Sequence, residues 1–216
     1  MNKDAIQTGL NAIRDAIPSH VTLVAVSKTQ PLEAIATAYA EGMRDFGENR
    51  ASELVEKAEA FPDDIRWHAI GHLQTNKAKM VVPYSHLVHA VDSTRIYDAL
   101  SQNINDNPLD VLLQVHIARE ASKFGFLEDE LRQLLDLSGN DTFSSKSIRI
   151  RGLMGMATFT QDSKQITQEF KGLRTFFDEL APSMGTEFDT LSMGMSGDWN
   201  IAIDEGSTLI RVGSAI

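Results

Sequence analysis

Leu23-Val24-Ala25-Val26-Ser27-Lys28-Thr29-Gln30-Pro31 joins an apolar run, a single lysine and a proline. The apolar run is typical of a buried strand, and the residues after the proline, at Leu32, Ile35 and Tyr39, have the spacing of a helix. Lys28 therefore stands at the carboxyl end of a strand. In parallel α/β folds ligands bind at that end, and an ammonium group leaving an apolar wall needs water or a specific partner. A lysine that merely begins a surface loop is the alternative interpretation.

The same alternation of strand and helix recurs along the chain. Short apolar runs without regular polar alternation are typical of parallel strands that helices cover on both faces. Eight such runs with helical stripes between them predict a closed (β/α)8 barrel, as one domain over residues 1–216, rather than an open doubly wound sheet. The predicted strands are 22–28, 44–48, 66–71, 87–92, 110–117, 148–157, 190–195 and 208–213. The clearest helical stripe consists of Ile166, Phe170, Leu173, Phe177 and Leu180.

The two ends of the chain predict one further feature of the barrel. An additional helix opens the sequence, with Ile6, Leu10, Ile13 and Ile17 on one face. Few residues follow the eighth predicted strand, so no last helix covers that side of the barrel. We expect the N-terminal helix to pack there instead. The serine-rich stretch 138–147 is predicted to be a loop before the sixth strand.

Composition limits the functions available to this chain. The 216 residues are 42% hydrophobic and 23% charged, as in ordinary globular proteins, and the formal net charge is −10. That charge argues against general binding to nucleic acid or anionic lipid. Without cysteine there is neither a disulfide nor a thiolate site. No signal peptide and no run near the ~20 apolar residues of a membrane span is present, so we expect a soluble, cytoplasmic protein and, with no obvious apolar stripe, a monomer.

Two glycine-containing runs are candidates for an anion site. Ser192-Met193-Gly194-Met195-Ser196-Gly197-Asp198-Trp199 follows the seventh strand and predicts a helix N-terminus with free backbone amides, and Arg211-Val212-Gly213-Ser214 ends the eighth. Either run alone is more often ordinary turn chemistry. A barrel, however, brings both to the same rim as Lys28, at the usual phosphate position. A lysine opposite a phosphate cradle suggests an aldehyde-bearing phosphate such as pyridoxal phosphate, because a Schiff base requires lysine rather than arginine.

Several stretches in this chain resemble the pyridoxal phosphate homeostasis protein family, the YggS/PROSC-type proteins that bind pyridoxal phosphate. They lie in the family's order over nearly the whole chain. The resemblance implies a single barrel like the N-terminal domain of alanine racemase and other fold-type III enzymes, without their second, β-rich domain. The matching stretches are Val26-Ser27-Lys28-Thr29, Phe46-Gly47-Glu48-Asn49-Arg50, Trp67 to Lys77, Gly152-Leu153-Met154-Gly155-Met156, Leu191 to Ser196 and Ile210-Arg211-Val212-Gly213.

The same resemblance implies a set of cofactor-binding residues. Lys28 would form the covalent aldimine with pyridoxal phosphate, Asn49 would lie beside the ring, and Arg211 near its pyridine and phosphate edge. Ser196, Gly213 and Ser214 would hold the phosphate. The complete predicted set is Lys28, Asn49, His72, Met193, Ser196, Arg211, Gly213 and Ser214.

Two residues depart from the family pattern. His116 stands where the family usually has asparagine, and Phe124, in Ser122-Lys123-Phe124-Gly125, stands where serine is usual. Both belong to one predicted loop, so they affect the ligand selectivity of that loop and leave the cofactor residues unchanged.

The remaining histidines and the tyrosines are interpreted as structural. His68, His72, His86 and His89 lie near two strands but share no metal-binding motif with a third ligand, so no metal is expected. Racemisation needs an acid or base on both faces of the substrate adduct. In the racemases that the chain resembles, the second base is a tyrosine associated with the second domain. Neither of the two tyrosines that fit helix faces, nor Tyr84 in a predicted loop, is a compelling replacement.

We therefore predict a protein without catalytic turnover. It would hold pyridoxal phosphate, limit the free aldehyde, supply apo-enzymes and so affect the balance of amino and keto acids. A small amino-acid racemase is the second hypothesis. A third is a barrel that binds another phosphate, with Lys28 as a plain counter-ion.

Overall fold

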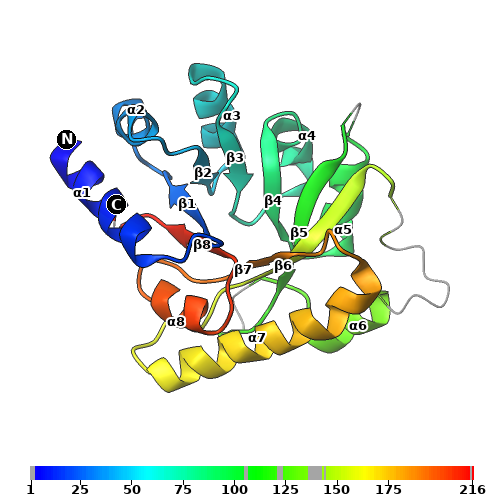
Figure 1. Cartoon of the computed structure of the whole chain (residues 1–216). Coiled ribbons are helices and arrows are strands. Elements are labelled where there is room, and N and C mark those ends of the chain that lie inside the picture. Colours follow the sequence, from blue (N-terminus) through cyan, green and yellow to red (C-terminus); the bar gives the residue numbers. More distant parts are fainter. Residues whose placement is uncertain (1–2, 105–106, 121–123, 136–142, 144, 215) are drawn as a thin grey trace.

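The computed structural model describes residues 3–104, 107–120, 124–135, 143, 145–214 and 216. Within them the chain forms a closed barrel in which parallel strands follow one another in sequence order and helices lie outside, as Figure 1 shows. Pairing between the first and eighth strands, from Thr22 with Leu209 to Ala25 with Val212, closes the barrel. The predicted (β/α)8 fold is confirmed.

All eight predicted strands are present, and seven of them end one to three residues earlier than the sequence predicts. The strands are β1 (Thr22–Val26), β2 (Asp45–Glu48), β3 (Arg66–Ala69), β4 (Ser85–Val91), β5 (Leu109–Val115), β6 (Ile148–Gly155), β7 (Thr190–Ser192) and β8 (Leu209–Val212). The residues between each observed and predicted end leave the backbone ladder and form the rim of the barrel. Polar side chains such as Lys28 thereby stand beyond the sheet.

Helices follow the strands around the outside. They are α1 (Lys3–Ala16), α2 (Leu32–Ala40), α3 (Ala51–Ala60), α4 (Ala78–Val81) after a 3-10 turn (Thr75–Lys77), α5 (Thr94–Ser101), α6 (Glu128–Leu135), α7 (Ser163–Met184) and α8 (Trp199–Asp204). The α7 stripe is buried as predicted, and Asp162 caps that helix by accepting from the amides of Lys164 and Gln165. The predicted loop 138–147 lies mostly outside the described residues.

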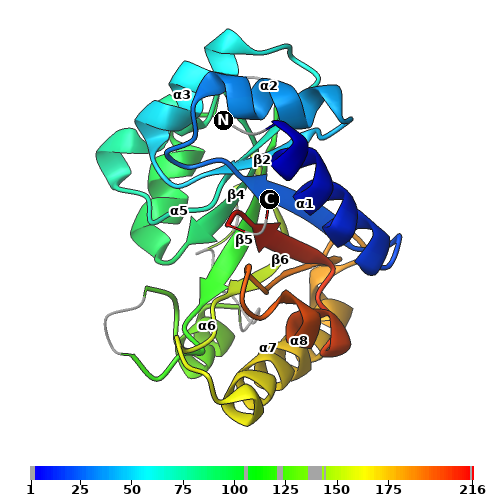
Figure 2. The same cartoon turned by 90° about the vertical axis from the view of Figure 1, so that its left-hand side faces the viewer.

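The N-terminal helix packs where the sequence predicts. Leu10 and Ile13 of α1 are buried in the core, and α1 contacts α2. Figures 1 and 2 both place α1 beside β1 and β8, next to the C-terminus. Ile6 of α1 lines a small apolar cavity together with Val26 and Gly213. The helix therefore covers the side of the barrel that has no long helix of its own.

Strand alternation divides the apolar residues into two groups. Neighbours such as Leu23 and Ala25 face the large core between strands and helices, whereas Val24 belongs to a separate cluster inside the barrel. That inner cluster also contains Leu87, Ala90, Leu112, Met154 and Leu209. Several polar side chains share the barrel interior with it, which is unusual because branched apolar residues dominate most such barrels.

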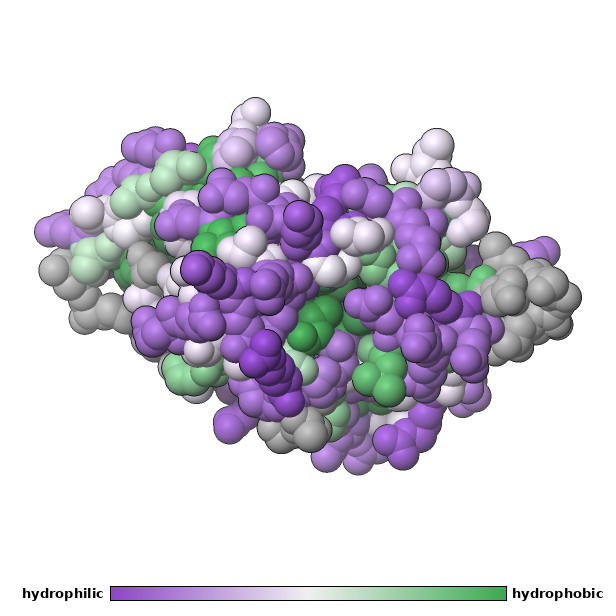
Figure 3. Space-filling model, turned by 90° about the horizontal axis from the view of Figure 1, so that it is seen from below, coloured by the Kyte–Doolittle hydropathy of each residue, from purple (hydrophilic) through white to green (hydrophobic). Residues whose placement is uncertain are grey.

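The outer surface carries mainly polar residues. The face seen in Figure 3 is predominantly hydrophilic, with hydrophobic residues in small separate areas. None of the described helices combines the length and the apolarity that crossing a lipid bilayer requires.

Candidate functional site

A cavity of about 500 Å³ opens at the carboxyl end of the barrel. Its walls come from the ends of β1, β2, β3, β5, β6, β7 and β8. Seven of the eight predicted site residues line this cavity together: Lys28, Asn49, His72, Ser196, Arg211, Gly213 and Ser214.

Met193 is the exception among the predicted residues. Its side chain is fully buried in the core between barrel and helices and does not line the cavity. Alternation explains the difference, because the preceding Ser192 faces the barrel interior and Met193 must then face outward. The neighbours Met195 and Met156 do line the cavity.

The loop that carries Lys28 is fixed on both sides by hydrogen bonds. Before it, the backbone carbonyl of Ser27 accepts from Lys57 Nζ at 2.8 Å. After it, the amide of Thr29 donates to Glu53 Oε2 at 2.8 Å, and Thr29 adopts a φ of 60°, which is rare for a β-branched residue. Lys28 itself is exposed to the cavity. Its backbone is thus held while its amine remains accessible.

A buried ion pair supports this loop from below. Lys57 Nζ lies 2.7 Å from Glu48 Oε1, with side chains only 6% and 0% exposed, and the Ser27 hydroxyl donates to the same oxygen at 2.6 Å. Burial raises the pKa of the Glu48 carboxyl, although Lys57 and Ser27 oppose that shift. Removing one member of such a pair would leave the other charge buried without compensation.

Arg211 forms the inner wall of the cavity. One guanidinium nitrogen donates to Ser192 Oγ and the other terminal nitrogen to the carbonyl of Gly155 at 3.0 Å. Burial lowers the pKa of Arg211 to about 10, so the side chain is still a cation at neutral pH. Both hydrogen-bond acceptors are neutral oxygens, and the negative charge of Asp198 partly offsets the effect of burial on the Arg211 pKa.

The glycine-containing loops after β7 and β8 meet at one side of the cavity. Ser196 Oγ accepts from the Gly213 amide at 3.2 Å, which joins the two loops. Gly194 has a φ of 97°, and a Cβ there would come within 2.6 Å of Ala202 Cβ, so only glycine fits. The amides of Ser196, Gly197 and Ser214 make no hydrogen bond within the described part of the chain. These donors are available to an anion.

The expected helix N-terminus contributes less than predicted. Helix α8 has six residues, and the amides of Asp198 and Trp199 are already bonded to the carbonyl of Met195. The Asp198 carboxylate in turn accepts from the Met195 amide at 2.6 Å. On this side of the cavity, Ser196 and Gly197 in the loop before the helix supply free amides.

An aromatic pair borders the mouth of the cavity. The rings of His72 and Phe124 are stacked, 3.7 Å between centroids and 9° from parallel. Asp92 Oδ2 lies 2.6 Å from His72 Nδ1, and Gln114 Nε2 donates to the Phe124 carbonyl at 2.9 Å. Phe159, 94% exposed, stands on the same rim. The ring of Phe124 thus packs on a predicted site residue.

The other departure from the family pattern lies away from the cavity. His116 Nε2 bonds to the carbonyl of Ala118 at 2.9 Å and is absent from the cavity lining. Ser122 and Lys123 lie outside the described residues. Sequence reasoning passed over Gln114 and treated Phe124 only as a departure, because their positions depend on how the loop after β5 folds back on that strand.

The charge of the cavity is opposite to that of the whole protein. Its described lining contains the cations Lys28 and Arg211 but neither aspartate nor glutamate, in a chain whose formal net charge is −10. No tyrosine lines it either; Tyr39 and Tyr84 donate to Asp64 and Glu59 on the surface. Within the described residues no group of three or more His, Asp or Glu could hold a metal ion.

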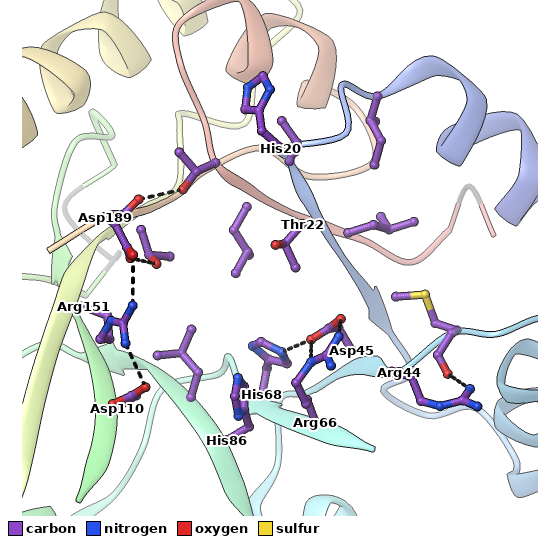
Figure 4. Close-up of a pocket in the computed structure, with 18 of the residues that line it drawn as sticks. His20, Thr22, Arg44, Asp45, Arg66, His68, His86, Asp110, Arg151 and Asp189 are labelled. Atoms are coloured by element: carbon purple, nitrogen blue, oxygen red, sulfur yellow. Dashed lines mark hydrogen bonds and ion pairs between the residues drawn. The ribbon is translucent and has the colours of Figure 1, made fainter. Parts of the chain in front are cut away.

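A larger cavity of about 890 Å³ lies at the opposite, amino-terminal end of the strands. Figure 4 shows its charged side chains arranged in pairs. Arg66 binds Asp45 through two nitrogens at 2.7 and 2.5 Å, and Arg151 lies between Asp110 and Asp189 at 3.5 and 3.0 Å. Such pairing stabilises the amino-terminal end of the barrel. In barrels of this kind that end contributes to stability, and the active sites lie at the other end.

Known proteins of similar sequence and structure agree with the barrel and its rim. The family model described as alanine racemase, N-terminal domain, matches residues 1–216. The pyridoxal phosphate homeostasis protein of Vibrio alginolyticus is 42% identical over 210 residues, covering 92% of this chain and 86% of that protein. PipY of Synechococcus elongatus, solved with PLP bound, has a TM-score of 0.86 and 34% identity and covers 97% of this chain and 98% of its own.

Alanine racemase from E. faecalis shares the fold alone. Its TM-score is 0.75 at 19% identity, over 99% of this chain and 57% of the racemase. The racemase thus extends well beyond the matching barrel. Because the family model spans the whole chain and the relatives match nearly all of it at this level of identity, the chain belongs to the pyridoxal phosphate homeostasis proteins, within the alanine racemase N-terminal domain family.

Proposed function

We propose that the cavity at the carboxyl end of the barrel binds pyridoxal phosphate and that the protein serves to hold and release this cofactor. One observation carries the proposal: two cations and three free backbone amides converge on a cavity whose described lining contains no carboxylate. A compact dianion with an aldehyde satisfies both the amides and the exposed lysine. PipY, which was solved with PLP bound, supports this choice of ligand.

Different residues of the cavity would contact different parts of the cofactor. Ser196 and Ser214 would hold the phosphate with their amides and hydroxyls, and Gly213, whose amide bonds to Ser196 Oγ, would join their two loops around it. Arg211 would face the pyridine ring from the inner wall. Asn49 would lie at the side of the ring. Gly71 fixes the backbone there, because a Cβ at Gly71 would lie 2.3 Å from the Asn49 carbonyl.

Lys28 supplies the covalent attachment in this proposal. When bound, the cofactor provides an aldehyde that reacts reversibly with amines. Lys28 Nζ would hold the cofactor through a Schiff base with this aldehyde, the carbonyl oxygen being lost as water. The fixed neighbours Ser27 and Thr29 keep this amine at the rim. Because water alone reverses the reaction, the site can also release its ligand.

Features of the cavity support a carrier over a catalyst. Beyond Lys28 and Arg211, His72 is the titratable side chain in the described lining, and one face of its ring is covered by Phe124 while Nδ1 faces Asp92. A racemase needs a second acid or base free to reach the substrate carbon. Delivery to apo-enzymes, a monomeric state and a cytoplasmic location stay predictions from the sequence.

Borohydride trapping tests the covalent site. Pyridoxal phosphate is added to the purified protein, the Schiff base is reduced, and modified lysines are mapped by mass spectrometry. We expect one adduct, at Lys28, and none in Lys28→Ala, whereas Lys77→Ala retains it. Scattered adducts that persist in Lys28→Ala would contradict the proposal and favour a plain counter-ion. Turnover of a chiral amino acid that Lys28→Ala abolishes would instead favour the racemase.

A further inference from the structure

A continuous column of polar side chains crosses the interior of the barrel. From the amino-terminal end, Asp45 Oδ1 lies 3.1 Å from His68 Nε2, and His68 Nδ1 lies 3.0 Å from His89 Nε2. His89 Nδ1 is 3.0 Å from Ser192 Oγ, which accepts from the Arg211 guanidinium. The column therefore joins the two ends of the barrel, and Figure 4 shows its first two members at the amino-terminal cavity.

Its two ends determine the direction of every hydrogen bond. Arg211 can only donate, and ionised Asp45, held by two nitrogens of Arg66, can only accept. With neutral imidazoles protonated on Nε2, Ser192 donates to His89, His89 to His68, and His68 to Asp45. Each polar hydrogen in the column then has an acceptor.

A doubly protonated His68 would leave one polar hydrogen of the column without an acceptor. If His68 were protonated on both nitrogens, His89 would have to donate to Ser192 instead of accepting from it. Ser192 is fully buried, so its hydroxyl hydrogen would then lack the acceptor that His89 provides. A second cation would also be added to the barrel interior that already holds Arg211. Burial lowers the pKa of His89 well below the usual value, which agrees with a neutral His89 ring.

The cost of burying these groups calls for a reason beyond filling space. Asp45, His68, His89, Ser192 and Arg211 are each less than 9% exposed. Apolar residues fill the same interior from other strands, including Val24, Leu112 and Met154. Apolar packing is thus available inside this barrel, and the polar column ends on the one cation that forms the inner wall of the carboxyl-end cavity.

We infer that Asp45, His68, His89 and Ser192 are positioning residues for Arg211, which fix the plane of its guanidinium from below and direct its remaining N–H groups into the carboxyl-end cavity. The identity of the ligand that Arg211 meets rests on the proposed function. The orientation of Arg211 does not, because every contact of the column is present in the protein alone. Asp45 thereby influences a site at the other end of the barrel.

Nuclear magnetic resonance of the ligand-free protein tests the column directly. We expect ¹⁵N shifts of His68 and His89 for neutral rings with hydrogen on Nε2, and separately resolved Arg211 guanidinium signals because rotation is restrained. Ser192→Ala should average those Arg211 signals, whereas Ser207→Ala, which removes another buried hydroxyl bonded only to backbone carbonyls, should not. A doubly protonated His68, or resolved Arg211 signals in Ser192→Ala, would overturn the inference.

Binding of pyridoxal phosphate provides the second test. We expect about tenfold weaker binding in Ser192→Ala and roughly threefold in Asp45→Ala, with a shifted absorbance maximum of the bound cofactor. Asp45→Asn, which keeps an acceptor oxygen for His68, should restore both. Asp110→Ala is the matched control, since Asp110 also pairs with arginines at the amino-terminal cavity but lies outside the column.

Equal effects of Asp45→Ala and Asp110→Ala on affinity and spectrum would overturn the inference. If the unaltered protein bound no pyridoxal phosphate, the proposed function would fail while the resonance measurement still decided whether the column orients Arg211.

Discussion

The two ends of this barrel use charge in opposite ways. At the amino-terminal end, Asp45, Asp110 and Asp189 each lie within ion-pairing distance of an arginine. At the carboxyl end, Lys28 and Arg211 line a cavity without a carboxylate among its described residues. The ion pairs at the start of the strands stabilise the fold. Lys28 and Arg211, which have no carboxylate beside them in the described cavity lining, can interact with a negatively charged ligand.

The Lys57–Glu48 ion pair lies beneath the Lys28 loop, at the carboxyl end, but we expect it to stabilise the fold and not to bind the ligand. Lys57→Met would leave Glu48 buried without its partner and should lower the free energy of unfolding by about 3–5 kcal/mol. Denaturant unfolding measures this. The double variant Lys57→Met with Glu48→Gln should recover much of the loss. A single variant as stable as the unaltered protein would show that the pair does not support the loop.

Replacing one arginine at each end of the barrel should affect ligand affinity at one end and the free energy of unfolding at the other. Arg211→Met is expected to weaken pyridoxal phosphate binding about 100-fold, since a charge-assisted contact contributes about 1.5–3 kcal/mol. Arg151→Met, at the amino-terminal cavity, should leave affinity within about twofold and reduce stability instead. Absorbance titration and denaturation of both variants provide the measurements. Equal losses of affinity in the two variants would contradict the claim that only the carboxyl end binds the ligand.

Acid should weaken the ion pair that Asp45 forms at the amino-terminal end. Burial alone would raise the pKa of Asp45, but hydrogen bonds from Arg66 and His68 outweigh it and hold the pKa at about 2, below the unperturbed 3.8. Because the folded-state pKa is the lower one, this stabilisation is present above pH 4 and is lost as pH falls toward 2. The difference corresponds to about 2 kcal/mol. Unfolding measured from pH 6 to 2 should therefore fall less steeply in Asp45→Asn, and identical slopes would contradict the assignment.

Phe124 at the cavity mouth should affect the rate at which the ligand enters and leaves more than the affinity of the site. Phe124 is half exposed and stacks on His72, so Phe124→Ser removes a ring from the cavity mouth without opening the core. We expect release of pyridoxal phosphate to become roughly threefold faster, a change of less than 1 kcal/mol. Stopped-flow transfer to a scavenging amine measures the rate. Phe159→Ser, which removes an exposed ring on the same rim, is the comparison. Slower release in Phe124→Ser would exclude a barrier at this ring.

Sequence periodicity was sufficient for the barrel and for most of the cavity. Lys28 and Ser196 could be expected at one rim because residues just beyond parallel strands meet there, and both line the cavity. Arg211, within β8, was predicted from the family resemblance and lines the same cavity. The Met193 side chain lies in the outer core instead of lining the cavity, since strand alternation decides which of two neighbouring residues faces inward. The column from Asp45 to Arg211 could not be predicted, because it depends on the side-chain geometry of β2, β3, β4, β7 and β8, which no single stretch encodes. The His72–Phe124 stack likewise depends on a loop folding back.

A crystal structure with pyridoxal phosphate would test most directly the claim that the two ends of the barrel have different roles. We expect density continuous with Lys28 Nζ, the phosphate at Ser196, Gly213 and Ser214, and no ligand in the amino-terminal cavity. Pyridoxal phosphate bound among Arg66 and Arg151, or lying in the carboxyl-end cavity without a bond to Lys28, would contradict the account.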